Sequence, residues 1–168
     1  MTRTHLIRPS TRDDLDAVDA LLAGSYPALL KKAYPPSVLV TAIPLISQAQ
    51  PRLLASGTYY VVLEDNVIVG AGGWSRAMPG RAGEEVGHVG HVRHVVTDHR
   101  CVRRGIGRRL MERIFAESEG AGVTRLECYA TTMAVPFYAS LGFATVGPIN
   151  VPLRPGIDLP AVHMRRSN

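Results

Sequence analysis

The chain has 168 residues, of which 46% are hydrophobic and 20% charged, a composition that suits one globular domain over residues 1–168. No apolar run approaches the roughly 20 residues that a membrane-spanning helix needs, so we expect no membrane association. The net charge of +5 would suit a nucleic-acid-binding domain. The arginines, however, cluster around one glycine-containing loop and not along a surface that also carries aromatic residues. A small polyanionic cofactor explains this cluster better than nucleic acid does.

The two cysteines and the N-terminus indicate the cellular compartment of the protein. Cys101 and Cys128 are the only cysteines, and the N-terminus has no apolar stretch of the kind that a signal peptide needs. Two thiols without a secretion signal indicate reduced cysteines. We therefore expect a cytoplasmic protein.

The N-terminal third predicts a strand followed by helices. Residues 5–9 form a short apolar strand that ends in a proline. Leucines and a valine recur at helical spacing over residues 12–23, and we expect Gly24 to help end this helix. Residues 25–36 mix helix formers with prolines and predict a short helix or an ordered loop. Residues 38–50 again have an apolar face, interrupted by a proline.

The middle of the chain predicts a β-hairpin and then an irregular strand. The β-branched and aromatic run 58–63 is a strand, 64–66 is the turn, and 67–75 is the partner strand. Residues 76–84 are rich in glycine and proline and predict a loop. Residues 86–95, VGHVGHVRHV, repeat every three positions, which fits neither a strand nor a helix. This repeat is either accidental or the sign of a β-bulge, which shifts the side-chain alternation by one residue.

The last third alternates helices and strands. A third helix covers residues 108–119, a fifth strand covers 123–129, and a short helix ends near Gly142. Residues 143–146 and 159–164 predict a final antiparallel pair with a long loop between them. Pairing of these terminal strands between two copies would make a homodimer.

The clearest chemical signal is RHVVTDHRCVRRGIGRRLM, residues 93–111, which predicts strand, turn, glycine-containing loop and helix. Free backbone N–H groups and the positive dipole end at a helix start attract anions. Gly105 and Gly107 let phosphates approach the backbone because no Cβ intervenes. Neighbouring arginines add positive charge. We infer a pyrophosphate-binding loop; the simpler alternative is a basic helix start whose glycines serve turn geometry alone.

Two motifs resemble those of the GCN5-related N-acetyltransferases, the GNAT family. VRRGIG, residues 102–107, is similar to the family's [QR]-x-x-G-x-[GA] motif, although Val102 replaces the usual Gln or Arg. FYASLGF, residues 137–143, is similar to the FY-x-x-x-GF motif and lies 30 residues further on. The resemblance covers residues 4–165. It implies a single-domain α/β (α+β) fold with a mixed central sheet of about six to seven strands, flanking helices and a β-bulge in the fourth strand.

The resemblance also implies acetyl-CoA as the acyl donor. Its pantetheine arm would pair with a parted fourth strand at Val95, Val96 and Thr97, and the N–H of Val95 would face the thioester carbonyl. Met133 stands where many family members have an asparagine that contacts the pantetheine. The diphosphate would be held by the loop residues Val102, Arg103, Arg104, Gly105, Ile106, Gly107 and Arg108.

The family's chemistry, direct attack of a primary amine on the thioester, assigns catalytic roles. His91 falls where many members carry a catalytic glutamate, and imidazole suits a general base. Glu84 or Glu85 are substitutes, and a solvated strand residue is the alternative for His91. Tyr138 matches the tyrosine that protonates the leaving thiolate; the alternative is a core aromatic.

The acceptor, a primary amine of a small molecule or peptide, is not readable from the sequence. In the family, the region between the first two helices lines the acceptor pocket, so Tyr26 and Tyr34 are candidate substrate contacts. Packing residues are the simpler alternative for both. A non-catalytic acyl-CoA sensor would have the same fold. We predict no metal site, because on a strand His91 faces away from His88 and His94, and zinc would need a fourth ligand nearby.

Overall fold

The computed structural model describes residues 3–78 and 81–168, and of residues 81–84 the backbone alone. The strands are β1 (His5–Pro9), β2 (Tyr59–Glu64), β3 (Val67–Ser75), β4 (Ala77–Met78), β5 (Arg81–Glu85), β6 (Val89–Thr97), β7 (Arg125–Ala130), β8 (Ala144–Arg154) and β9 (Ile157–Ser167). Seven of them form one sheet in the order β1-β2-β3-β6-β7-β9-β8, while β4 and β5 form a separate pair. In the large sheet only β6 and β7 run parallel, which confirms the predicted mixed sheet.

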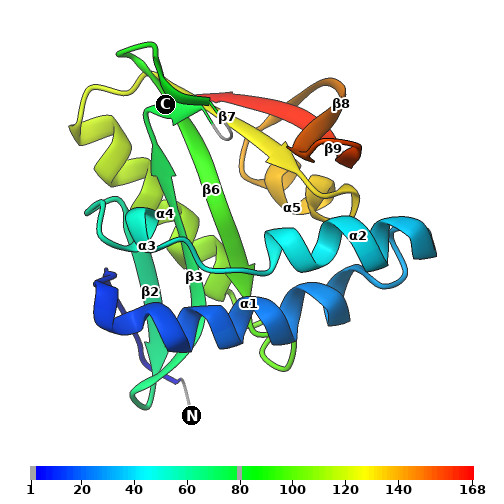
Figure 1. The fold of residues 1–168 in the computed structure, drawn as a ribbon. Helices are drawn as coiled ribbons and strands as arrows, with labels where there is room; N and C mark the ends of the chain where they lie inside the picture. Colours follow the sequence, from blue (N-terminus) through cyan, green and yellow to red (C-terminus); the bar gives the residue numbers. More distant parts are fainter. Residues whose placement is uncertain (1–2, 79–80) are drawn as a thin grey trace.

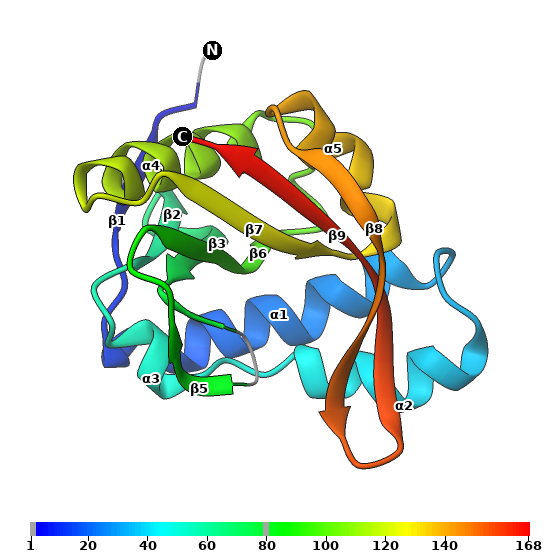
Figure 2. The same cartoon turned by 90° about the horizontal axis from the view of Figure 1, so that it is seen from above.

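Helices cover both faces of this sheet. They are α1 (Leu15–Leu30), α2 (Pro36–Ile46), α3 (Pro51–Leu54), α4 (Ile106–Gly120) and α5 (Val135–Ser140), with 3-10 turns η1 (Arg12–Asp14) and η2 (Thr132–Ala134). Figure 2 shows α4 and α5 on one face and α1, α2 and α3 on the other. None of the helices in the described ranges is long and apolar enough to cross a membrane.

The helix α4 is held to the sheet by one apolar stripe. Leu110, Met111 and Ile114 are completely buried, and they pack with Trp74 and Leu126 of the sheet. Burying each such side chain contributes roughly 1.5–3 kcal/mol. The predicted helix is therefore confirmed, and packing on the sheet places its N-terminus at the glycine-containing loop.

The helix α1 is longer than predicted. It runs through Gly24 and Pro27 to Leu30, where the sequence predicted an end at Gly24 and a separate element afterwards. A glycine inside a helix costs roughly 1 kcal/mol, and burial of Leu30 and of Ser25 outweighs it. The Ser25 hydroxyl also accepts a hydrogen bond from the N–H of His99 at 3.3 Å, so tertiary contacts override the local signal.

Two predicted loops contain strands. The stretch between the last two predicted strands forms most of β8 and the start of β9 in one long hairpin, because alternate residues such as Val151 and Leu153 pack against the α2 region. The prolines Pro148 and Pro152 misled the prediction, but β8 is the outermost strand, where proline is tolerated. The predicted loop 76–84 contains β4 and most of β5, and its residues 79–80 lie outside the described residues.

Candidate active site

The strands β6 and β7 start as neighbours and then part (Figure 1). The last pair between them is His91 with Glu127, whereas β7 stays paired with β9 to its end. On its other side, β6 pairs Arg93 with Gly73 and Val96 with Ala71, so β6 has one extra residue there. This is the predicted bulge in the fourth strand of the large sheet, and the backbone of the β6 end is open on the β7 side.

Two tyrosine hydroxyls fix the bulge. Tyr59 donates to the carbonyl of His94 at 3.0 Å, and Tyr26 donates to the carbonyl of Val95 at 3.4 Å. Burial raises the pKa of both tyrosines, so both hydroxyls remain donors at neutral pH. Opposite the bulge lies Gly72, where a Cβ would come within 2.7 Å of the Val95 side chain. The bulge therefore depends on a glycine in β3 and on hydroxyls from α1 and β2.

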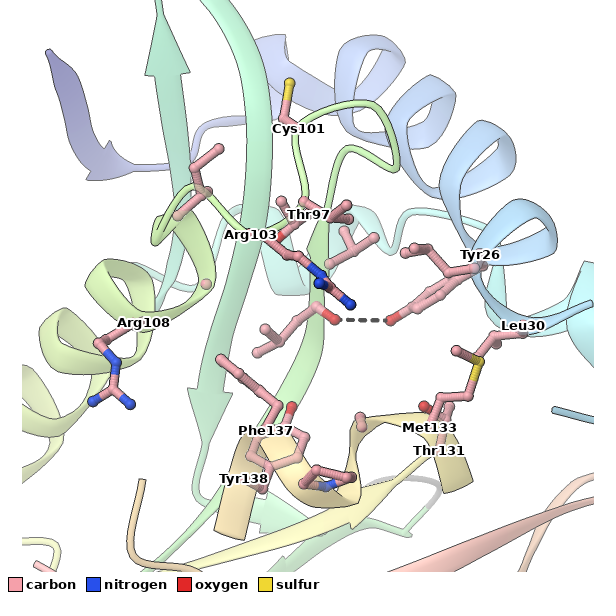
Figure 3. Close-up of a pocket in the computed structure, with 18 of the residues that line it drawn as sticks. Tyr26, Leu30, Thr97, Cys101, Arg103, Arg108, Thr131, Met133, Phe137 and Tyr138 are labelled. Carbon is pink, nitrogen blue, oxygen red and sulfur yellow. Dashed lines mark hydrogen bonds between the residues drawn. The ribbon is translucent and has the colours of Figure 1, made fainter. Parts of the chain in front are cut away.

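A cavity of about 680 Å³ opens beside the end of β6, and we call it the donor cavity (Figure 3). It is bordered by the parted strand, the glycine-containing loop and the α5 region. Every predicted donor-binding residue except Arg104 lines it, as do Tyr26 and Tyr138. The residues concerned are Val95, Val96, Thr97, Val102, Arg103, Gly105, Ile106, Gly107, Arg108, Tyr26 and Tyr138.

The loop of this cavity has free hydrogen-bond donors. Among the described residues, the backbone N–H groups of residues 102–108 donate to no backbone carbonyl, whereas those of Cys101 and Arg109 donate to the carbonyls of Asp98 and Gly105. Gly105 caps α4 with a φ of +77°, a conformation that glycine adopts without strain. A Cβ on Gly107 would lie 3.1 Å from the Phe137 ring, so that side of the loop has no spare room. The loop fits a bound diphosphate.

The arginines of the loop point in different directions. Arg103 extends into the donor cavity toward Tyr26 (Figure 3). Arg104 does not line it, because its guanidinium lies 3.4 Å from the Glu64 carboxylate. Hydrogen bonds from His5 and Arg3 hold the pKa of Glu64 below its usual value, so this carboxylate is charged. The Arg104 side chain thus connects the loop to β2.

Tyr138 is positioned by α5 in an aromatic cluster. Its ring centroid lies 5.2 Å from that of Phe137 and 5.3 Å from that of Phe143. Burial raises its pKa well above that of free tyrosine, so the phenol is protonated and able to donate at neutral pH. Burial also raises the pKa of Cys128 to about 12, which leaves that thiol neutral and unsuited to be a nucleophile.

A second cavity of about 360 Å³, the acceptor cavity, lies between α2, β6, β7 and the β8–β9 hairpin. Tyr26 and Thr131 line both cavities, so the two adjoin at the parted strands. Apolar walls come from α2 and the hairpin. The polar side chains that line it are Gln48, Gln50, Arg93, His94, Thr131 and Arg154, together with the tyrosines Tyr26 and Tyr129.

One amide links two of these polar residues. Gln50 accepts a hydrogen bond from Arg93 at 3.3 Å through Oε1, and its Nε2 lies 3.1 Å from Nε2 of His94. With the amide oriented by Arg93, its nitrogen donates to an unprotonated imidazole nitrogen. Burial and the Arg93 charge lower the pKa of His94 to about 4, in agreement with a neutral ring.

Three predicted site residues lie outside both cavity linings. His91 is buried at the paired end of β6 beside Glu127, and burial lowers its pKa, so the imidazole is neutral. Tyr34 is buried, and its hydroxyl donates to the Pro160 carbonyl at 2.8 Å and accepts from the N–H of Thr132 at 3.2 Å. Arg104 is the third. The side chain of Glu84 lies outside the described residues, and Glu85 is exposed on β5.

Sequence reasoning missed Arg93, His94, Thr131 and Gln50 as cavity residues. The first two belong to the irregular run VGHVRHV, and the bulge decides which of its side chains face the acceptor cavity. The irregular period was therefore a usable signal for Arg93 and His94. Nothing in the sequence alone indicated that Gln50, 43 residues before Arg93, would contact it.

Comparisons with known proteins agree with this fold. The sequence model of the acetyltransferase (GNAT) domain matches residues 37–165. A GCN5-related N-acetyltransferase from Rhodopseudomonas palustris superposes with a TM-score of 0.80 and 18% identity, over 100% of this chain and 98% of that one. PaiA N-acetyltransferase from Thermoplasma acidophilum, solved with coenzyme A, superposes with a TM-score of 0.74 and 12% identity, over 98% of this chain and 99% of that one. YncA of Salmonella typhimurium, solved with acetyl-CoA, superposes with a TM-score of 0.67 and 18% identity, over 98% of this chain and 94% of that one.

A curated relative matches over a shorter stretch. Serotonin N-acetyltransferase 2 of Oryza sativa subsp. japonica is 44% identical over 50 residues, which are 30% of this chain and 25% of that protein. The domain match covers most of the chain, so the chain belongs to the GNAT acetyltransferase family. Members of this family are acyltransferases, and their donor is acetyl-CoA.

Proposed function

We propose that the protein transfers an acetyl group from acetyl-CoA to a primary amine by direct attack of that amine. The observation that carries the proposal is that two cavities adjoin where β6 and β7 part, with Tyr26 and Thr131 in both linings. A donor bound on one side and an amine bound on the other would meet there without a covalent enzyme intermediate. Holding two reactants in this geometry is itself a large part of catalysis.

The residues of the donor cavity have distinct tasks in this proposal. Bound acetyl-CoA supplies the activated acetyl group. The free N–H groups of residues 102–108 bind its diphosphate, and the open backbone of Val95, Val96 and Thr97 pairs with its pantetheine. The N–H of Val95 faces the thioester carbonyl and stabilises the oxyanion that develops during attack. Tyr138, protonated at neutral pH, gives its proton to the departing thiolate.

The amine must also lose a proton. We keep His91 as the proposed general base, acting through water, because it is neutral on the strand that borders the acceptor cavity. His94 lies closer to that cavity, but its Nε2 is occupied by Gln50. Measuring kcat against pH for His91→Gln and His94→Gln tests this assignment. Loss of the acidic limb in His94→Gln alone would transfer the role to His94.

Release of free CoA tests the proposed function. We expect thiol release from acetyl-CoA with at least some members of a panel of primary amines, serotonin included because of the relative named above. Tyr138→Phe should lower kcat by about 10²-fold, since general acid catalysis contributes 10²–10⁴-fold, while the Kd for acetyl-CoA stays nearly unchanged. Acetyl-CoA binding without thiol release from any amine would favour the sensor.

Two further properties belong to the same proposal. We place the protein in the cytoplasm, because Cys101 and Cys128 are both free thiols. We also propose a homodimer through the outer edge of β8, the last strand of the sheet. Light scattering at several protein concentrations tests the dimer, and a monomer at all of them would rule it out.

A further inference from the structure

Arg93 is a partly buried cation in the wall of the acceptor cavity. Its guanidinium donates to the Ser75 hydroxyl at 3.0 Å and to the Gln50 carbonyl oxygen at 3.3 Å. Both acceptors are neutral, and no described carboxylate lies within ion-pair distance of it. Burial lowers the pKa of Arg93 because it disfavours the charged form. A half-buried charge with no described carboxylate beside it is unfavourable, and an anionic ligand would relieve it.

The rest of the cavity has the same charge preference. Arg154, an exposed residue at the end of β8, is a second arginine in the lining, and none of the described lining residues is an Asp or a Glu. A polyamine or another acceptor with a second cationic group would find no carboxylate among these described lining residues. An anionic group would find a planar guanidinium with donors to spare, and such guanidinium groups bind carboxylates bidentately.

Position along β6 relates this arginine to the reaction. Arg93 is two residues before Val95, so their α-carbons are at most about 7 Å apart. An anionic group a few bonds from the amine can therefore contact Arg93 while the amine approaches the thioester. The opposite walls, Leu45, Ile46 and Leu159 among them, are apolar and suit a hydrocarbon or aromatic side chain.

We propose that the acceptor is an amino acid with an apolar side chain, and that Arg93 recognises its carboxylate. The inference rests on the proposed function, because it names the substrate class of the same site. Gln50 and Ser75 act as positioning residues, since their hydrogen bonds set the orientation of the guanidinium. The relative named for serotonin matches only 30% of this chain and does not fix the acceptor.

The test uses pairs of amines that differ by one carboxylate: phenylalanine with phenethylamine, leucine with 3-methylbutylamine, and 5-hydroxytryptophan with serotonin. For the wild type we expect kcat/KM to favour the carboxylate member of at least one pair by about tenfold or more, the effect of a charged hydrogen bond. Arg93→Met should abolish that preference, mainly through KM, and Arg93→Lys should restore part of it. The ratio within a pair is independent of the fraction of folded protein.

Arg52→Met, at an exposed position on α3 outside both linings, is the matched control and should keep the wild-type ratio. Thiol release that favours the carboxylate-free members in every pair would overturn the inference and leave the acetyltransferase function intact. An unchanged ratio in Arg93→Met would overturn the role of Arg93. No thiol release from any amine, with acetyl-CoA still raising the melting temperature, would overturn the proposed function itself.

Discussion

The donor and acceptor cavities adjoin but are built differently. The donor side consists largely of backbone: free N–H groups of a helix start and the open edge of a bulged strand, with glycines where a Cβ would intrude. The acceptor side consists of side chains from α2, β6, β7 and the β8–β9 hairpin. Backbone sites accept one ligand over many sequences, whereas side-chain sites change with each substitution. The part of the domain that would bind the common donor is therefore separate from the part whose side chains would select the acceptor.

The largest expected effect is on the donor side. In Gly107→Glu the new anionic side chain must either displace Phe137 or occupy the donor cavity. We therefore expect acetyl-CoA binding to be abolished. Thermal unfolding with and without acetyl-CoA measures this as the loss of the stabilisation that ligand provides. Gly24→Glu, where a Cβ meets nothing within 4 Å, is the control. A ligand-induced rise in Tm that survived in Gly107→Glu would refute the loop assignment.

The next effect concerns the bulge that separates the two sides. A Cβ in Gly72→Ala would meet the Val95 side chain at 2.7 Å and the Val95 α-carbon at 3.0 Å, so β6 must shift. We expect a loss of about 1–3 kcal/mol in unfolding free energy, as for other overpacked sites. Turnover should fall more than acetyl-CoA affinity, because the glycine-containing loop is not displaced. Gly87→Ala, where a Cβ meets nothing within 4 Å, is the control. A kcat in Gly72→Ala equal to that of the wild type would contradict the role of the bulge in turnover.

Tyr34→Phe separates packing from substrate contact. Removing the hydroxyl leaves the Thr132 N–H and the Pro160 carbonyl without their partner. We expect the unfolding free energy to fall by about 1–2 kcal/mol while KM for the amine is unchanged. Urea unfolding and steady-state kinetics measure the two quantities. A higher KM at unchanged stability would instead support the predicted substrate contact.

The smallest effect is the pH dependence of stability that His94 causes. Its pKa is 6.5 when unperturbed and about 4 in the folded protein, so between these values the unfolded chain binds a proton that the folded chain does not. The contribution of His94 to stability is therefore complete above pH 6.5 and is lost as the pH falls toward 4. Between pH 7 and pH 4.5 we expect Tm to fall by a few degrees less in His94→Gln than in the wild type. This difference corresponds to about 1 kcal/mol or more of unfolding free energy. His88→Gln, at an exposed position, is the control.

The same contrast explains how much the sequence could predict. The loop at Gly105 and Gly107 and the bulge after His91 were predictable, because both are local patterns with a backbone cause. The direction of Arg104 was not, since it depends on Glu64, 40 residues away in sequence. The final antiparallel pair was predicted, but the α1 extension and the continuation of β8 through residues 147–154 were missed, because burial against distant elements outweighed glycine and proline. Arg93 and Gln50 meet only in three dimensions, so the acceptor side required the structure.

The position of α1 has a thermodynamic consequence. The Ser25 hydroxyl accepts a hydrogen bond from the N–H of His99, just before the glycine-containing loop, and its neighbour Tyr26 belongs to both cavity linings. In the proposed reaction α1 would contact both ligands through Tyr26, so ordering of this helix by one ligand would lower the entropy that the other must lose. By linkage the two effects are equal. We expect coenzyme A to increase amine affinity by the factor by which the amine increases coenzyme A affinity, and Ser25→Ala to bring that factor toward one in calorimetric titrations.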